Sequence, residues 1–325
     1  MIITQTPLRI SFLGGGTDFP GFYREFGGCV LTTAIDKYVY TIVKERFDEA
    51  IVVGYTKKEW VEKVEQIEHE LVREAMKKTG VSKSIEITFL SDVPAAGSGL
   101  GSSSAVTVGV LNALYLYSGR AVEAERLARE ACEIEIDHLR KPIGVQDQYI
   151  AAFGGINFIE FHKDGTISVE PLGLAKELLN DLAGQMMVFF TGRTRQAVSI
   201  LKEQSQNIEK KNKVLVQMAQ QARTARRLLV SGRVGELGKL LDEGWRLKKT
   251  LASKISDTEL DNIYSAAKGA GAYGGKISGA GGGGFLTLLV PSGKRESVRK
   301  ALKGLREMPM GLARDGSKVI FNIRK

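Results

Sequence analysis

The sequence has 325 residues with 43% hydrophobic content and a formal net charge of +9. The length and hydrophobic content exclude a disordered chain and favour two domains or one large one. The longest apolar run, from Ala105 to Tyr117, is too short to cross a bilayer, and the first ten residues lack a signal-peptide pattern. We therefore expect a soluble, cytoplasmic protein with no membrane partner.

The sequence offers few ligands for a soft metal. Cys29 and Cys132 lie far apart in the chain, which fits two core thiols in a reducing compartment. The three histidines form no metal-binding pair. A bound metal would therefore have oxygen ligands.

Residue patterns predict a chain that changes from strand-rich to helix-rich. Alternating or continuous apolar runs predict strands over 2–13, 30–47, 51–55 and 85–90, and a hairpin over 155–171. Helical spacing predicts a helix with apolar residues from Trp60 to Ala75 that Gly80 ends, an apolar helix after residue 101 and a helix over 122–137. The remaining predicted elements are a strand over 185–190, basic helices up to residue 256, a helix over 257–269, a strand over 285–290, a helix over 294–305 and a strand over 319–323. This order indicates an α+β fold with domains over 1–180 and 181–325.

The positive charge is concentrated between Arg193 and Lys254, where 15 Lys and Arg stand against 5 Asp and Glu, a local excess of +10. Such a segment favours nucleic acid, a membrane surface or a phosphorylated small molecule, or is the solvated face of helices. We favour the solvated face. Trp245 is the one aromatic residue of the segment that bases would stack on, so we predict no nucleic-acid partner.

A loop rich in glycine and serine, "PAAGSGLGSSSA" over 94–105, leads directly into the apolar helix. Glycines allow close backbone approach, and the free N–H groups and positive dipole end of the helix favour phosphate oxygens. The serine hydroxyls would cap the helix, contact phosphate or ligate Mg²⁺. No Lys follows the last glycine, so this is not the ordinary phosphate loop. A flexible linker would not lead into an apolar helix.

Three further stretches raise the question of a ligand. The cluster "GGKISGAGGGGF" over 274–285 precedes a strand, which disfavours a dinucleotide site and leaves a ligand contact or a plain hairpin bend. Asp147 follows Glu135 by twelve residues, and each acid is either functional or an ordinary helix residue. In "PLRISFLGGGTDFPG" over 7–21, three consecutive glycines are more than a turn requires.

Taken in order, these motifs resemble the GHMP kinase superfamily of galactokinase, homoserine kinase, mevalonate kinase and phosphomevalonate kinase. The matching features are P-x-R with the glycine turn and Asp18, PxxGxGLGSSS, Glu135 with GVQDQY, and KISGAGGGGF. The resemblance implies an N-terminal domain like the second domain of ribosomal protein S5, a ferredoxin-like C-terminal domain, and ATP with Mg²⁺ between them.

The resemblance also implies a role for each matching residue. Asp147 would be the catalytic aspartate beside the acceptor hydroxyl, and Arg9 would lie close to it and keep it ionised. Ser103 and Glu135 would hold Mg²⁺. The ATP phosphates would contact Gly97, Ser98, Gly99, Leu100, Gly101, Ser102, Ser103 and Ser104. The substrate would contact Gly15, Gly16, Thr17, Asp18, Gly281 and Gly282.

The acceptor is indicated by the first motif. Gly15 and Gly16 stand where galactokinases carry Glu and His, and the motif is similar to that of the heptose 7-phosphate kinases and, more distantly, the fucokinases. That subgroup implies phosphorylation of D-glycero-D-manno-heptose 7-phosphate at O1, for nucleotide-activated heptose and surface polysaccharide. We expect the 7-phosphate to contact Arg193, Arg195 or Lys276. The alternative functions are another sugar-1-kinase of the superfamily, such as a fucokinase, and a non-catalytic sensor that binds sugar and ATP. A homodimer is compatible with either function.

Overall fold

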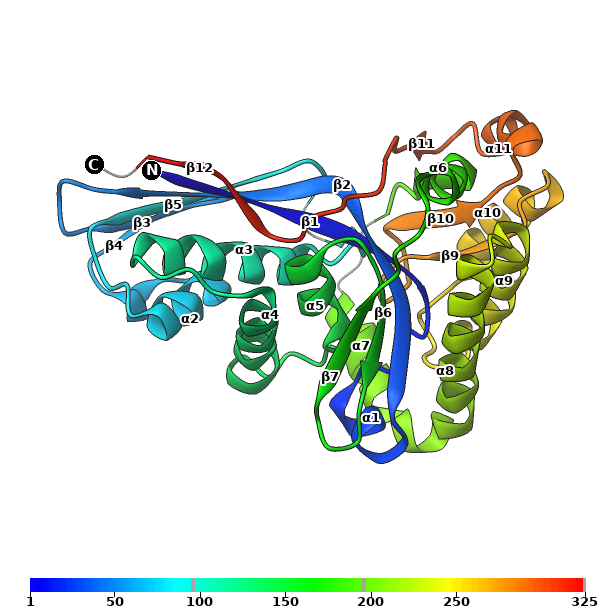
Figure 1. The fold of residues 1–325 in the computed structure, drawn as a ribbon, viewed down its shortest axis with the longest axis horizontal. Helices are drawn as coiled ribbons and strands as arrows, with labels where there is room; N and C mark the ends of the chain where they lie inside the picture. The colour runs from blue at the N-terminus through cyan, green and yellow to red at the C-terminus, as the bar shows by residue number, and fades with distance from the viewer. Residues whose placement is uncertain (95–96, 194–196, 324–325) are drawn as a thin grey trace.

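The computed structural model describes residues 1–94, 97–193 and 197–323. Figure 1 shows a long sheet with helices beneath it in one part of the molecule and a smaller sheet with helices in the other. The chain ends are neighbours at the free end of the long sheet, where the Met1 ammonium donates to the Ile323 carbonyl over 2.7 Å. No helix within the described residues is long and apolar enough to cross a membrane.

The long sheet has eight strands and is antiparallel except where β3 and β5 pair. Its central strand β2 pairs along one edge with β1, and along the other with β6 and then with β5. The strands are β1 (Ile2–Leu13), β2 (Gly28–Glu45), β3 (Ile51–Gly54), β4 (Lys58–Val61), β5 (Ile85–Ser91), β6 (Ile156–Phe161), β7 (Ile167–Pro171) and β12 (Lys318–Asn322).

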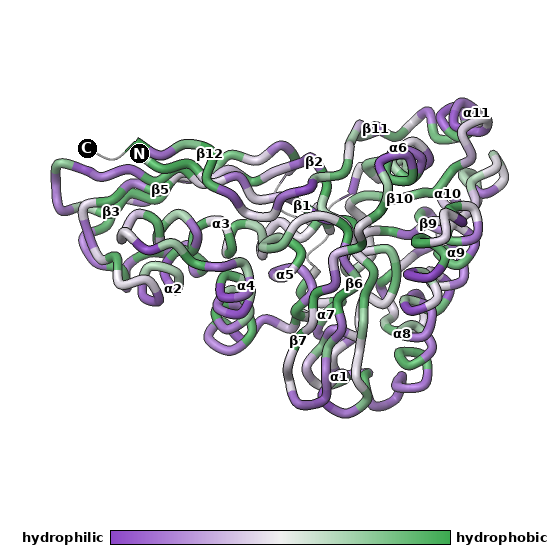
Figure 2. The backbone as a smooth tube through the Cα atoms, viewed as in Figure 1, coloured by the Kyte–Doolittle hydropathy of each residue, from purple (hydrophilic) through white to green (hydrophobic). Residues whose placement is uncertain are grey.

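The helix α3 is the centre of the larger core. It packs on β1 and β2, and α2, α4 and α5 pack around it, so it is apolar on almost every face. Figure 2 shows the neighbouring α4 as far more hydrophilic. The helices of this part are α1 (Pro20–Phe26), η1 (Val64–Gln66), α2 (Glu70–Thr79), α3 (Ser102–Tyr117), α4 (Ala124–Cys132), η2 (Glu133–His138) and α5 (Gln146–Phe153).

The smaller sheet has the order β11-β8-β10-β9 and is antiparallel throughout. A second core lies against it, in which Phe19 and Phe22 from the N-terminal half pack with residues such as Leu215 and Trp245. Its strands are β8 (Met186–Phe190), β9 (Gly274–Ile277), β10 (Phe285–Leu289) and β11 (Arg306–Glu307). Its helices are α6 (Lys176–Gln185), α7 (Ala197–Gln206), α8 (Ile208–Val230), α9 (Val234–Lys249), α10 (Thr258–Gly269), η3 (Ser292–Lys294) and α11 (Arg295–Ala301).

The two sheets with separate helices confirm the predicted α+β class. The predicted helix from residue 60 is wrong in its first part, because Trp60 and Val61 belong to β4, which pairs with β3. Gly80 caps α2 as predicted, with φ of +78°. The domain boundary near residue 180 stays a prediction, and β12, which lies beyond it in the chain, pairs with β1 in the long sheet.

Candidate active site

A cavity of about 560 Å³ opens where the two parts of the molecule meet. Its walls come from the end of β1 and the turn after it, the loop before α3, the loop before α5, and the glycine cluster after β9. Each of the sequence motifs described above therefore contributes to one space, which we call the central cavity. Its volume and the few charged side chains that converge in it are typical of a small-molecule site.

Arg9 and Asp147 form a bidentate ion pair in the central cavity. The Arg9 Nε donates to Asp147 Oδ1 over 2.7 Å, and Arg9 Nη2 donates to Oδ2 over 2.6 Å. The remaining Arg9 nitrogen, Nη1, donates to the Gly99 carbonyl over 2.6 Å, and Arg9 is only 5% exposed. Because the planar guanidinium fixes both carboxylate oxygens, the orientation of Asp147 is set before any ligand binds.

Glu135 is fully buried beside the first turn of α3. It accepts hydrogen bonds from Ser103 Oγ over 2.5 Å, Ser104 Oγ over 2.8 Å and Gln148 Nε2 over 2.8 Å. Burial raises the pKa of Glu135, and the hydroxyl and amide donors oppose that rise. The chain switches from the α-helix α4 to the π-helical turn η2 at Glu133, and such turns are frequent at functional sites.

The backbone of the loop before α3 lies in direct contact with the glycine cluster after β9. A Cβ atom at Gly99 would lie 2.5 Å from the Ser278 carbonyl oxygen, and one at Gly279 would lie 2.7 Å from the Gly99 Cα atom. Only glycine permits this approach of two backbones. Gly101 begins α3 at φ of +80° without a side chain to cap it, which leaves the N-terminal N–H groups available to an anion.

Asp18 is buried in the turn after β1. Its Oδ1 accepts from the Gly16 N–H over 2.8 Å, and its Oδ2 accepts from Gln146 Nε2 over 3.0 Å. A Cβ atom at Gly144 would lie 2.0 Å from Asp18 Oδ2. The loop before α5 can therefore lie this close to the carboxylate only because residue 144 is glycine. Burial raises the pKa of Asp18, and the Gly16 hydrogen bond opposes the rise.

Two lysines are buried in the same cavity. Lys248 donates to Gln204 Oε1 over 2.9 Å and to the Gly15 carbonyl over 3.4 Å, whereas Lys276 has no hydrogen-bond or ion-pair partner among the described residues. Burial lowers the pKa of Lys248 to about 8. Burial and the neighbouring cations Lys248 and Arg9 lower the pKa of Lys276 to about 7.

Several residues predicted from the sequence do not line the cavity. Thr17 is buried with its hydroxyl bonded to the Cys29 backbone, and Leu100 belongs to the core. Gly281 and Gly282 pack on Ile255 instead. Among the residues expected to contact a second phosphate, Arg193 pairs with Asp257 and Glu259, and Arg195 lies outside the described residues.

Other cavity residues were not predicted. Ser11, Gln146 and Lys248 all line the space, and the glutamine stands in the quoted motif GVQDQY without having been singled out. The sequence contains a pattern that could have predicted the burial of Lys248, because this residue follows Leu241 and Trp245 at helical spacing on the buried face of α9. A lysine in an apolar stripe is worth inspection.

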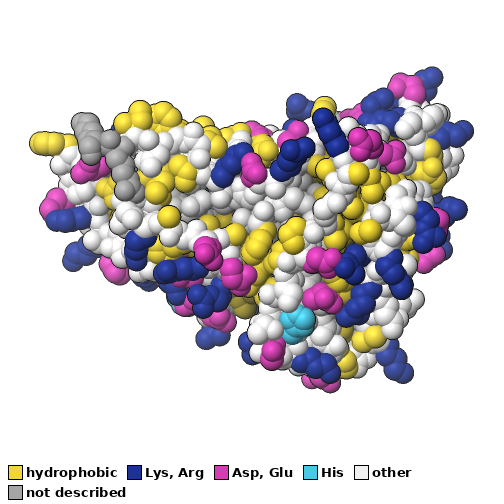
Figure 3. Space-filling view, in the orientation of Figure 1, with side chains coloured by type: hydrophobic (Ala, Val, Ile, Leu, Met, Phe, Trp, Pro, Cys, Tyr) yellow, Lys and Arg dark blue, Asp and Glu magenta, His cyan; other side chains and the backbone are white. Residues whose placement is uncertain are grey.

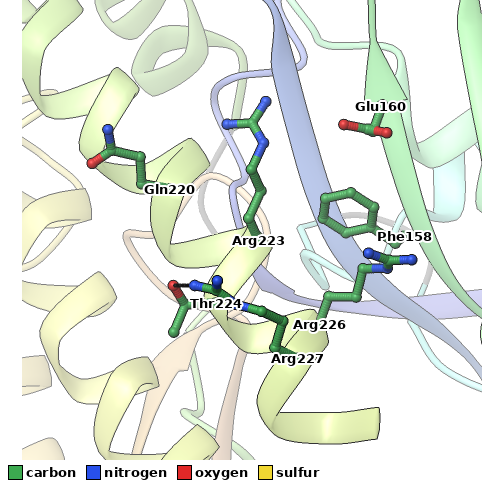
Figure 4. Close-up of a pocket in the computed structure, with 7 residues that line it drawn as sticks. All are labelled: Phe158, Glu160, Gln220, Arg223, Thr224, Arg226 and Arg227. Atoms are coloured by element: carbon green, nitrogen blue, oxygen red, sulfur yellow. Dashed lines mark hydrogen bonds between the residues drawn. The ribbon is translucent and has the colours of Figure 1, made fainter.

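A second hollow, of about 510 Å³, lies between α8 and β6, and we call it the α8 groove. Figure 4 shows arginines reaching from α8 toward Phe158 and Glu160. Arg226 pairs with Glu170 over 2.5 Å and lies 5.4 Å from the centre of the Phe158 ring, while Arg227 donates to Thr224. In Figure 3, Lys and Arg side chains spread over the outer face around α8 and α9, with acidic groups among them.

Comparison with known proteins identifies the family. The family description "GHMP kinases N terminal domain" matches residues 63–155, and "GHMP kinases C terminal" matches residues 225–305. The D-glycero-α-D-manno-heptose 7-phosphate kinase of Campylobacter jejuni subsp. jejuni serotype O:2 is 34% identical over 319 residues, which cover 93% of each chain. The chain belongs to the GHMP kinase family.

Solved structures agree with this assignment. A D-glycero-D-manno-heptose 1-phosphate kinase from Bacteroides thetaiotaomicron matches this GHMP kinase with a TM-score of 0.83 and 28% identity over the whole of both chains. A mevalonate kinase structure, at 18% identity and a TM-score of 0.76 over 97% of this chain and 100% of its own, shares the fold. The family match and the 34% identity to a heptose 7-phosphate kinase together identify this GHMP kinase as an ATP-dependent sugar kinase.

Proposed function

We propose that this kinase transfers the γ-phosphoryl group of ATP to the anomeric O1 of D-glycero-D-manno-heptose 7-phosphate in the cytoplasm. The observation that carries the proposal is the ion pair between buried Arg9 and half-buried Asp147, which faces one cavity together with the glycine loop before α3 and the Asp18 turn. The product would be the 1,7-bisphosphate used for nucleotide-activated heptose and surface polysaccharide. The names of two heptose phosphate kinases among its relatives support this acceptor class.

ATP would bind with its phosphates at the loop over 97–104. The N–H groups at the start of α3 and the positive end of its dipole favour the charge of the phosphates. The Ser98 and Ser102 hydroxyls lie 2.9 Å apart and stabilise the loop from inside. Because contacts within the protein hold these groups, they are preorganised, and preorganisation is a large part of electrostatic catalysis.

The residues beside this loop fit Mg²⁺. Ser103 Oγ and a Glu135 carboxylate oxygen are hard oxygen ligands of the kind that Mg²⁺ takes, and they lie side by side in a hydrogen bond of 2.5 Å. To hold Mg²⁺, the two oxygens would exchange this hydrogen bond for bonds to the metal. Mg²⁺ in phosphoryl-transfer sites is usually held by one or two protein ligands together with substrate phosphates and waters, so we propose the same for Ser103 and Glu135. Bound Mg²⁺ would neutralise charge on the β and γ oxygens.

Asp147 would accept a hydrogen bond from the acceptor O1 hydroxyl and orient its lone pair toward the γ-phosphorus. The new O1–phosphorus bond forms while the bond to the β–γ bridging oxygen breaks, and ADP leaves with that electron pair. The hydroxyl proton passes to Asp147 late in the transfer. Asp18, with Gly15 and Gly16, would position the sugar through its other hydroxyls.

An acceptor panel tests the proposal. ADP release would be measured with ATP, Mg²⁺ and, in turn, heptose 7-phosphate, fucose, galactose and mevalonate. We expect turnover on heptose 7-phosphate that exceeds the other acceptors by at least tenfold in kcat/KM. No turnover on heptose 7-phosphate, or a preference for fucose, would overturn the proposed acceptor.

A further inference from the structure

The central cavity contains a subsite that the transfer step does not use. A Cβ atom at Gly15 would lie 3.5 Å from Gln146 Nε2, 3.6 Å from Ser11 Oγ and 4.0 Å from Lys276 Nζ. Three polar side chains from β1, α5 and β9 therefore converge on the space in front of Gly15, which has no side chain of its own to fill it. Because Ser11, Gln146 and Lys276 also line the central cavity, a ligand in that cavity can reach all three.

Gln146 Nε2 donates to Asp18, but other polar atoms around this space lack partners. Ser11 Oγ and Gln146 Oε1 are buried and have no hydrogen-bond partner in the described part of the chain. The Lys276 ammonium also has no hydrogen-bond or ion-pair partner among the described residues, although its nitrogen stays in reach of the cavity and is not fully buried. Ser11 is 6% exposed and Lys276 is 8% exposed. Burying polar groups without partners is costly, so an arrangement of this kind is explained when a ligand supplies the partners.

The charges of the subsite indicate the sign of that ligand. The cations facing it are Arg9, Lys248 and Lys276, whereas the facing carboxylates are Asp18 and Asp147. Arg9 and Asp147 neutralise each other in their ion pair, and the charge of Asp18 offsets that of Lys248. Lys276 is then the cation without an opposite charge. A neutral sugar would leave Lys276 buried and uncompensated, whereas a phosphate would pair with it and accept from Ser11.

We propose that Lys276 and Ser11 bind the phosphate that the acceptor already carries, so that the enzyme selects phosphorylated sugars over neutral sugars. This inference rests on the proposed function and names the residues that give it its substrate class. Arg193, which the sequence also offered as a contact for this phosphate, is not part of the proposed subsite because its guanidinium pairs with Asp257 and Glu259. The competing role for Lys276 is contact with the transferring γ-phosphoryl group, because Gly279 two residues after β9 touches the phosphate loop.

Kinetics with matched acceptors separate the two roles. The wild type and Lys276→Met would be assayed with heptose 7-phosphate and with the same heptose lacking the phosphate. For heptose 7-phosphate we expect KM to rise about 10- to 100-fold in the variant, in the range for loss of a charged contact, with a smaller effect of Ser11→Ala. For the neutral heptose, kcat/KM should stay within about twofold. An equal loss on both acceptors, or a loss in kcat alone, would overturn the subsite.

Binding without ATP distinguishes this inference from the proposed function. Calorimetric titration with heptose 7-phosphate should give at least tenfold tighter binding to the wild type than to Lys276→Met, with neutral heptose unaffected. Such a result in an enzyme that does not phosphorylate heptose 7-phosphate would overturn the proposed function and keep the subsite. Equal binding to both proteins would overturn the subsite. Lys276→Arg, which keeps the charge, and Lys254→Met, which removes an exposed charge, are the controls.

Discussion

In the central cavity Lys276 is buried without a partner among the described residues, whereas in the α8 groove Arg226 pairs with Glu170 and lies over Phe158. Both regions are basic and both are hollows of similar size. They differ in how far the cations are buried, because Lys276 is 8% exposed whereas Arg223 and Arg227 of the groove are exposed to solvent. An ion pair at the surface contributes little and needs no ligand, while a buried cation that lacks a partner lowers stability and is retained at functional sites.

This difference also explains the excess of positive charge in the segment over 193–254. Most of that charge lies on outer helix faces, as Figure 3 shows around α8 and α9. Among the described residues of this segment, Lys248 is the cation that lines the cavity, where it contacts Gly15 and Gln204. Charge count alone therefore does not separate a binding site from a solvated face, whereas burial and partners do.

The largest effect is expected inside the cavity at Asp147. Asp147→Asn keeps the shape but cannot take the hydroxyl proton, so kcat should fall by about 10²- to 10⁴-fold while ATP binding is retained. Single-turnover kinetics and nucleotide titration would measure the two effects. Asp181→Asn, on the surface helix α6, is the matched control. Full activity of Asp147→Asn would show that another group orients the acceptor.

The next effect concerns the metal. Glu135→Gln removes the charge that we propose binds Mg²⁺. Loss of a group that only supports a metal ligand weakens metal binding by ~10–100-fold, so the Mg²⁺ concentration for half-maximal activity should rise at least this much. A Mg²⁺ titration at saturating ATP measures this shift. An unchanged Mg²⁺ dependence with a destabilised fold would assign Glu135 to the support of Ser103 and Ser104 alone.

A smaller effect is expected from pH. Lys276 has a pKa of about 7 and must be charged to bind a phosphate, so kcat/KM for heptose 7-phosphate should fall as pH rises above about 7. The other charged groups that face Lys276 are Lys248, Arg9, Asp18 and Asp147. In Lys276→Arg the fall should move to the pKa of Lys248, about 8. A profile identical in the variant would contradict this assignment.

The smallest effect is expected in the α8 groove. Replacing Arg223, Arg226 and Arg227 by Gln removes three positive charges but only surface contacts, so kcat/KM should stay within about twofold and stability should fall by about 1 kcal/mol at most. Steady-state kinetics and thermal unfolding would measure both. A selective loss for the phosphorylated acceptor would move the phosphate subsite to this groove.

The sequence predicted the parts of the site that short motifs specify. The glycine loop before α3 and the spacing of Glu135 and Asp147 are local patterns. The structure places the loop and Asp147 in one cavity with Arg9, and Glu135 behind the loop, bonded to Ser103 and Ser104. Motif spacing could not show which way a side chain points. Thr17 stands in the glycine turn, yet its hydroxyl is bonded to the Cys29 backbone, which is distant in sequence and adjacent through the sheet.

The remaining site residues depend on tertiary contacts. Gln204 and Lys248 approach the turn after β1 only because α7 and α9 pack near it, and nothing local in the sequence predicts that approach. The fold class was predictable from the order of strands and helices. The return of β12 to the long sheet was not, because strand pairing between the two chain ends is determined by the whole fold.

The most direct test of the account is the identity of the product. The enzyme would be incubated with ATP, Mg²⁺ and heptose 7-phosphate, and the product analysed by phosphorus and carbon NMR. We predict a second phosphate ester on the anomeric carbon, with the 7-phosphate unchanged. A second phosphate on another carbon, or none at all while a neutral sugar is phosphorylated, would contradict the assignment of the cavity to a phosphorylated acceptor.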